Sequence, residues 1–132
     1  MEHDVELLPE PFRLDPSLPI YEQLVDAIRR QIVAGRIPPG TRLPSVRDLA
    51  AGRNINPTTA ARTYQELERL GLIVTYRGQG TFVAQDMNVI ANARKDMMRK
   101  AIRDFKALAA SLGLTAQQLL DFDKEDADDN HS

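Results

Sequence analysis

Two stretches of this sequence hold residues that could bind phosphate groups. "RGQG" at 77–80 places Gly78 and Gly80 two residues apart, next to Arg77. This glycine spacing opens many phosphate-binding loops, and an arginine fork matches phosphate oxygens. "NPTTAAR" at 56–62 groups short polar side chains ahead of an arginine, as helices that read DNA do at their N-terminal end. Whether either stretch binds a cofactor or a nucleic acid depends on the elements that carry it.

Other kinds of chemistry find little support in the sequence. There is no cysteine, and both histidines, His3 and His131, lie in polar terminal segments. We therefore expect no metal site, no thiol nucleophile and no histidine general base. Paired carboxylates that could act as acid and base are not found either. We predict neither an enzyme nor a bound cofactor. No apolar run approaches the ~20 residues of a membrane span, so we expect no membrane association and a cytoplasmic protein.

The net charge of −2 conceals an uneven distribution along the 132 residues. Residues 1–10 hold four acids and no base, and residues 121–132 hold six acids against one lysine. Between them, residues 11–86 hold ten arginines against seven acids, and residues 87–120 hold six bases against two acids. A basic body between two acidic ends is compatible with a nucleic-acid partner, which the net charge alone would argue against.

Three amphipathic helices are predicted in the first half of the chain. The first covers 19–35, with proline in its first turn and a glycine at its end. After a proline-rich turn and a short extended piece, Ser45 caps a second helix, which "GRNIN" then breaks. Asn56 followed by Pro57 starts the third helix, and Gly71 ends it. Two helices separated by so short a turn indicate a helix-turn-helix.

The glycines of "RGQG" lie between two β-prone runs, "LIVTYR" and "TFVAQ". A dinucleotide-binding loop needs a helix after its glycines, but here Thr81-Phe82-Val83 predicts a strand. A hairpin with positive φ at its tip fits better. The order helix, short strand, helix, turn, helix and hairpin predicts an α+β fold, an N-terminal winged helix-turn-helix.

Residues after Asp86 predict a small C-terminal helical hairpin. Apolar residues recur at helical spacing up to Gly113, and a short second helix is expected over about 116–122, with Thr115 and Gln118 as a capping box. So small a unit cannot bury its apolar face alone, which favours dimerisation. The predicted dimer interface is Ile90, Met97, Ala101, Phe105, Leu108, Leu112 and Leu119.

The chain is accordingly divided into four segments. Residues 1–18 are predicted to be a flexible N-terminal arm and residues 19–86 the winged helix-turn-helix DNA-binding domain. Residues 87–122 are predicted to be a two-helix dimerisation unit, and residues 123–132 an acidic disordered tail.

The candidate DNA contacts come from three places in the winged helix. Arginine near a helix start and exposed polar side chains at the next helix start can reach phosphates and base edges, and a glycine tip with an arginine can enter a minor groove. The alternative is a purely structural role, in which the threonines only cap a helix and the arginines are solvated. The predicted DNA-binding set is Arg42, Ser45, Arg47, Asn56, Pro57, Thr58, Thr59, Arg62, Arg77, Gly78 and Gln79.

At "LPSVRDLA", "INPTTAARTYQELERLGLI" and "RGQGTFV" the sequence closely resembles the GntR family of bacterial transcriptional regulators, from about Ile20 to Val83. The short helical tail resembles the YtrA-like subfamily. The resemblance implies a homodimeric repressor that binds a palindromic operator in double-stranded DNA, often that of its own operon and a linked ABC transporter. It assigns DNA contacts to Arg47, to Asn56, Thr58 and Thr59, and to Gly78.

The sequence departs from the family pattern where relatives often have arginine, at Pro57 and Ala61, and where they have leucine-glycine, at Arg53-Asn54. Asparagine tolerates the left-handed conformation, so the turn is expected to form. We therefore predict a sequence-specific DNA-binding transcriptional regulator. The alternative is a winged-helix module that binds another protein and not DNA. A small-molecule effector is kept as a further candidate partner, and the sequence does not give its identity.

Overall fold

The computed structural model describes residues 7–9 and 12–130, with side chains as far as 127. Both histidines lie outside these residues. The chain divides into two compact units, the first ending at Arg94 and the second beginning at Lys95. Each unit is described below by itself.

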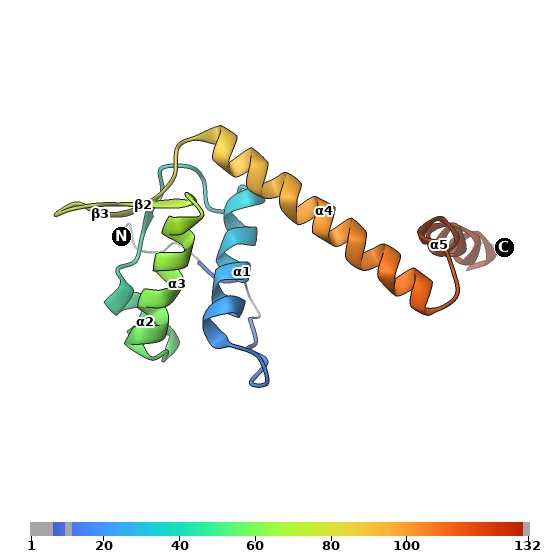
Figure 1. The fold of residues 1–132 in the computed structure, drawn as a ribbon, viewed down its shortest axis with the longest axis horizontal. Helices are drawn as coiled ribbons and strands as arrows, with labels where there is room; N and C mark the ends of the chain where they lie inside the picture. Colours follow the sequence, from blue (N-terminus) through green and yellow to red (C-terminus); the bar gives the residue numbers. More distant parts are fainter. Residues whose placement is uncertain (1–6, 10–11, 131–132) are drawn as a thin grey trace. The chain divides into compact units, whose positions relative to one another are not determined.

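The first unit is a winged helix-turn-helix with an α+β architecture, as predicted. Its elements, in chain order, are α1 (Ile20–Val33), β1 (Arg42–Leu43), α2 (Val46–Arg53), α3 (Pro57–Arg69), β2 (Ile73–Tyr76) and β3 (Gly80–Val83). The strands form an antiparallel sheet in the order β1-β3-β2. In Figure 1, α1 and α3 lie side by side, α2 lies near the start of α3, and the β2–β3 hairpin extends from the other end of α3.

The core of this unit lies between the helices and the sheet. Leu24 and Ile28 of α1 and Leu67 of α3 are fully buried, because they repeat at helical spacing on the facing sides of the two helices. Ile73 and Val83 pair across β2 and β3 and are also buried. These contacts fix where the start of α3 and the hairpin lie.

The predicted helix ends are confirmed, with one difference. Ser45 caps α2 by accepting a hydrogen bond from the Asp48 amide at 3.0 Å, and Asn56 caps α3 through the Thr58 amide at 2.8 Å. Helix α2 continues through Gly52 and ends at Arg53 instead of stopping at the glycine, and Asn54 caps it with φ of 54°. A side-chain amide can hydrogen-bond locally, so Asn54 can adopt the left-handed conformation that the glycine of leucine-glycine adopts in the family pattern.

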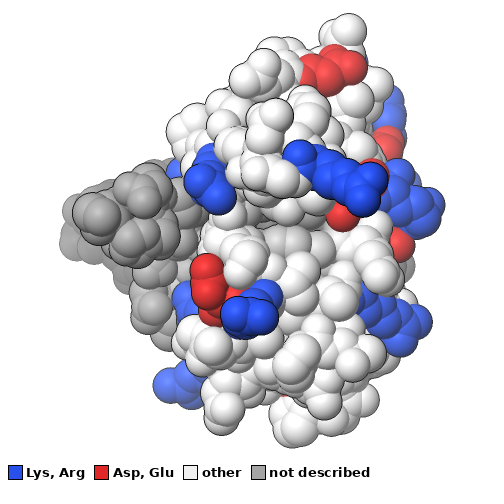
Figure 2. Space-filling model, turned by 90° about the vertical axis from the view of Figure 1, so that its left-hand side faces the viewer, with Lys and Arg blue, Asp and Glu red and all other residues white. Residues whose placement is uncertain are grey.

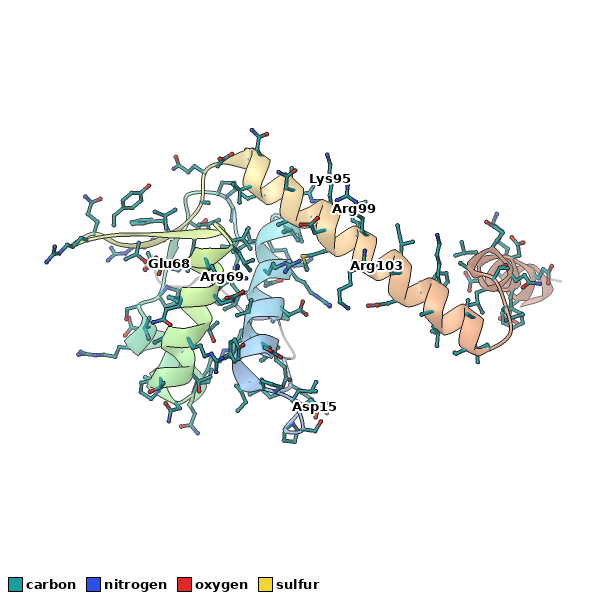
Figure 3. All side chains as sticks on the ribbon, viewed as in Figure 1. Asp15, Glu68, Arg69, Lys95, Arg99 and Arg103 are labelled. Atoms are coloured by element: carbon teal, nitrogen blue, oxygen red, sulfur yellow. The ribbon has the colours of Figure 1, made fainter. Side chains whose placement is uncertain are left out.

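The segment before α1 differs from the predicted flexible arm. Leu7 and Leu8 are 4% and 0% exposed and belong to the core of the first unit. Asp15 and Gln23 exchange two hydrogen bonds of 2.7 Å, which tie the segment to α1 (Asp15 is labelled in Figure 3). Ser17 donates to the Asp15 carboxylate and lowers the pKa of that group. The described part of the arm is therefore packed.

The first turns of α4 (Met87–Ser111) also belong to the first unit. Ile90 is 3% exposed and lies in the core, and Arg94 donates to the Val33 carbonyl over 3.0 and 2.7 Å. The assignment of Ile90 to a dimer interface is corrected, because its side chain is already buried within its own chain.

The second unit contains the rest of α4 and α5 (Ala116–Asn130). Thr115 and Gln118 form the predicted reciprocal capping box, with hydrogen bonds of 2.8 and 3.1 Å. Helix α5 runs to Asn130, not to about residue 122, so residues 123–130 are helical where a disordered tail was expected. Asp123, Glu125 and Asp126 therefore belong to a helix and not to an irregular tail.

Candidate nucleic-acid interface

The start of α2 presents Arg47 to solvent. Val46 is half-buried and Leu49 and Ala50 are buried, so the first turn of the helix turns Arg47 outward. Within the described part of the chain, the Arg47 side chain has no ion pair or hydrogen bond. Ser45 is exposed, but its hydroxyl oxygen already caps the helix. Arg47 is therefore free to pair with an anion, whereas Ser45 positions the turn that carries it.

The start of α3 exposes a short polar surface. Asn56, Pro57 and Thr58 are exposed, while Thr59 is half-buried, and its carbonyl accepts a hydrogen bond of 2.9 Å from the Thr63 hydroxyl. The Asn56 side-chain oxygen is occupied by the cap, which leaves its NH₂ group as a donor. The positive end of the helix dipole lies at this turn and favours an anion there. Thr58 has the more open position of the two threonines.

Tyr64 connects the two helix starts. Its ring is buried, and its hydroxyl donates to the Pro44 carbonyl at 2.7 Å, just before α2 begins. Burial raises the pKa of Tyr64 above its ordinary value, with a smaller contribution from the Asp48 charge. This hydrogen bond fixes α2 relative to α3 and thereby the position of Arg47 relative to Thr58. The two partners lie 20 positions apart in the sequence, so no local pattern indicates this contact.

Arg62 is less free than the sequence indicates. Its guanidinium carbon lies 3.8 Å from the centre of the Tyr21 ring, a cation–π contact between α3 and α1. The residue remains exposed, so the stacked guanidinium can still donate from its edge. Tyr21 was not foreseen as part of the site, because the two residues are far apart in sequence.

At the C-terminal end of α3, the charge of Arg69 is balanced by a carboxylate of the same helix. Arg69 forms two hydrogen bonds to the Glu66 carboxylate, and this contact holds the pKa of Glu66 below its ordinary value (Figure 3 labels Arg69). Glu68 is exposed beside them. Of the two arginines of α3, Arg62 forms no ion pair within the described part of the chain, although its charge also helps to lower the pKa of Glu66.

The hairpin tip has the geometry of a wing. Arg77, Gly78 and Gln79 are exposed, and the Gln79 amide donates to the Tyr76 carbonyl at 2.9 Å. Gly78 has φ of 78°, and a Cβ there would meet no atom within 4 Å. The backbone at the tip is therefore bare and open. Gly80 starts β3, which confirms a hairpin in place of a cofactor loop.

Arg42 joins the wing from β1. It is exposed and pairs with Phe82 in the sheet. Its side chain lies across Gly80, where an added Cβ would be 3.0 Å from its Nε, and the φ of 125° at Gly80 also favours glycine. The structure thus brings Arg42 close to the Arg77–Gly80 tip, although 35 to 38 positions separate them in the sequence.

The charge of these elements is predominantly positive. Residues 42–83 hold six arginines against three acids. Figure 2 views the side toward which the hairpin points, and basic side chains are spread around a largely uncharged centre with fewer acidic ones between them. Such a surface can bind a polyanion.

Two further properties of the described residues bear on function. Within residues 7–9 and 12–130, no three His, Cys, Asp or Glu side chains come together as metal ligands would. None of the helices in the same part of the chain combines the length and the apolar character that a bilayer crossing requires.

Comparison with known proteins agrees with this geometry. The model of the "Bacterial regulatory proteins, gntR family" matches residues 20–83, the winged-helix region. The uncharacterized HTH-type transcriptional regulator YhcF of Bacillus subtilis is 40% identical over 105 residues, covering 80% of this chain and 87% of that protein. The HTH-type transcriptional repressor YtrA of the same organism is 34% identical over 116 residues, covering 86% and 89%.

A solved structure extends the similarity to the fold. A GntR family transcriptional regulator from Listeria monocytogenes aligns with a TM-score of 0.78 and 35% identity, covering 85% of this chain and 98% of that one. These relatives are transcriptional regulators, not enzymes. The chain belongs to the GntR family of DNA-binding bacterial transcriptional regulators, and its similarity to YtrA supports the YtrA-like subfamily.

Proposed function

We propose that this protein is a sequence-specific repressor that binds a palindromic operator as a homodimer. By resemblance to YtrA-like regulators, its target is its own operon together with a linked transporter operon. Its place of action is the bacterial cytoplasm, where the DNA is. We assign no small-molecule effector.

One observation supports the proposal most strongly. Arg47, Thr58 and the Arg77–Gly78 tip are all exposed, and the elements that carry them pack around one hydrophobic core. The start of α3 fits a major groove, where short polar side chains read base edges. Arg47 supports a contact with a backbone phosphate, and the bare wing tip with Arg42 beside it supports a contact at the adjacent minor groove. The predicted DNA-binding residues thus divide into base-reading, phosphate-binding and positioning groups.

The two-helix segment supports the homodimeric part of the proposal. Leu108 and Leu112 of α4 are 55% and 61% exposed in the single chain, and Phe122 of α5 is 65% exposed. Exposed apolar side chains at helical spacing are typical of a helix that packs against another chain. A two-fold dimer presents two copies of α3 to two half-sites about one helical turn apart.

The proposal is tested by selecting fragments of the source organism's genome with the purified full-length chain. We expect a small set of enriched sites that share an inverted repeat and lie upstream of the chain's own gene. A parallel selection with a Thr58→Ala, Arg77→Ala variant controls for background and should lose the enrichment.

Enrichment of random fragments, or of none, would contradict the proposal. It would favour the alternative, a winged helix that binds another protein. The repressor assignment has its own readout, because a reporter driven by the recovered site should rise when the gene is deleted and fall when it is restored.

A further inference from the structure

The second unit carries an apolar stripe that the single chain leaves uncovered. Met98 and Ile102 are 56% and 52% exposed, and with Phe105 and Leu112 they follow one side of α4. In this unit Ala109 is the one buried residue among residues 95–127. The spacing of four, three and seven residues keeps these side chains on one stripe of the helix.

A basic stripe runs beside the apolar one. Lys95, Arg99, Arg103 and Lys106 are spaced by four, four and three residues, so they share a face that adjoins Ile102. Figure 3 labels Lys95, Arg99 and Arg103 on successive turns of α4. Arg99 contacts Asp96 at 3.2 Å in an exposed pair, and the other three make no ion pair within the described part of the chain. The stripe therefore has little acidic compensation of its own.

Helix α5 has the complementary character. A hollow of about 510 Å³ is lined by the apolar side chains of Leu114, Leu119 and Phe122 and by the polar side chains of Gln118, Asp121 and Glu125. Asp121 and Glu125 lie one turn apart on the same side of the helix. Gln117 donates to Asp121 at 3.0 Å, and no ion pair joins either acid to α4 among residues 95–127. A hollow lined by apolar and acidic side chains suits an apolar stripe that lies beside a basic one.

We propose that the α5 hollow of one chain receives the Met98–Ile102 stripe of a second copy, with Asp121 and Glu125 opposite Arg99 and Arg103 of that copy. This inference rests on the homodimer proposed above and specifies what aligns its two chains. Under two-fold symmetry the contact occurs twice, so every charge pair is doubled. The apolar area provides most of the affinity. The charge pairs set the register of the two chains and disfavour alternative pairings that bring like charges together.

Charge reversal in the full-length chain tests the pairing. One variant carries Arg99→Glu and Arg103→Glu, and the other carries Asp121→Lys and Glu125→Lys. At low salt each variant alone should self-associate with a dissociation constant raised about tenfold or more, measured by sedimentation equilibrium, because each attractive pair becomes repulsive. Mixing the two variants should restore wild-type affinity, since both sets of pairs are then of opposite sign.

Controls separate this pairing from net charge and from the dimer itself. A variant with Arg30→Glu and Lys100→Glu has the same change in net charge as the Arg99→Glu, Arg103→Glu variant but lies outside the basic stripe, and it should dimerise as the wild type does. A wild-type dimer that neither reversal weakens, or variants that do not recover on mixing, would overturn the pairing and leave the homodimer intact. A monomeric wild-type chain would overturn both, while its DNA binding is measured independently.

Discussion

Replacing Arg47 tests DNA binding without disturbing the fold, because its side chain forms no ion pair in the described structure. We predict that Arg47→Ala lowers operator affinity about tenfold in moderate salt by removing one phosphate contact per chain. The plot of log affinity against log salt should become shallower by about one unit per chain. Fluorescence anisotropy over a salt series measures both quantities.

The matched control is Arg30→Ala, which removes the same charge from α1. Arg30 is exposed and pairs with Asp26 at 3.1 Å, so its loss costs little stability. Unchanged affinity and slope in Arg47→Ala, or an equal loss in Arg30→Ala, would rule out a specific phosphate contact at Arg47.

Tyr64 has a positioning role that can be measured through stability. Tyr64→Phe leaves the Pro44 carbonyl without its 2.7 Å donor, and we expect the free energy of unfolding to fall by about 1–2 kcal/mol. Urea denaturation monitored by circular dichroism measures the change. Tyr76→Phe is the control, because Tyr76 is 52% exposed and should tolerate the loss of its hydroxyl.

The same tyrosine predicts an alkaline limit of stability. Burial raises the Tyr64 pKa in the folded state above the ordinary value of 10.0, so the unfolded chain loses its proton first. The stabilisation is fully present below about pH 10 and is lost as the pH rises toward the folded pKa. The difference in unfolding free energy between wild type and Tyr64→Phe should therefore shrink above pH 10, and a constant difference would contradict this account.

Many of the residues now proposed at the interface could be predicted from the sequence, but the contacts that position them could not. Capping residues and glycines report local geometry, so Ser45, Asn56 and Gly78 could be located from their neighbours in sequence. The contacts of Arg62 with Tyr21 and of Tyr64 with Pro44 depend on how helices pack, and no local pattern encodes them.

At the scale of elements, the wing depends on a tip that only glycine accommodates easily. Gly78→Val places a β-branched residue at φ of 78°, and we expect a loss of about 1–2 kcal/mol in unfolding free energy together with weaker operator binding. Thermal denaturation and anisotropy measure the two effects.

Gly52 provides the matched control within α2. It lies inside the helix, and an added Cβ would meet no atom within 4 Å. Gly52→Ala should raise the unfolding free energy by about 0.5–1 kcal/mol and leave DNA affinity unchanged. If both glycine variants behave alike, the wing tip has no special conformational requirement.

The elements themselves were largely predictable, and the exceptions have physical causes. Periodicity and caps located α1, α3 and the β2–β3 hairpin. They failed for Leu7 and Leu8, because a segment that is neither helix nor strand leaves no periodic signal and is buried by tertiary packing alone. They also ended α5 too early, because its acidic second half looks like a solvated tail even though nothing in it breaks a helix.

At the scale of the whole molecule, operator affinity should depend on α4. Leu112→Glu places a charge on the exposed apolar stripe, and we expect it to produce monomers that bind the operator at least about tenfold more weakly, since one chain contacts one half-site. Size-exclusion chromatography with light scattering reports the mass. Ala107→Glu, on another side of α4, should remain dimeric.

The central claim is that the chain reads a DNA sequence. The most direct measurement compares its equilibrium affinity for a recovered operator with that for a duplex of equal length and scrambled half-sites, at several salt concentrations. We predict a preference of about 10³-fold or more for the operator, with affinity for both duplexes falling steeply as salt rises. Equal affinity for the two duplexes, or no binding to either, would contradict the account.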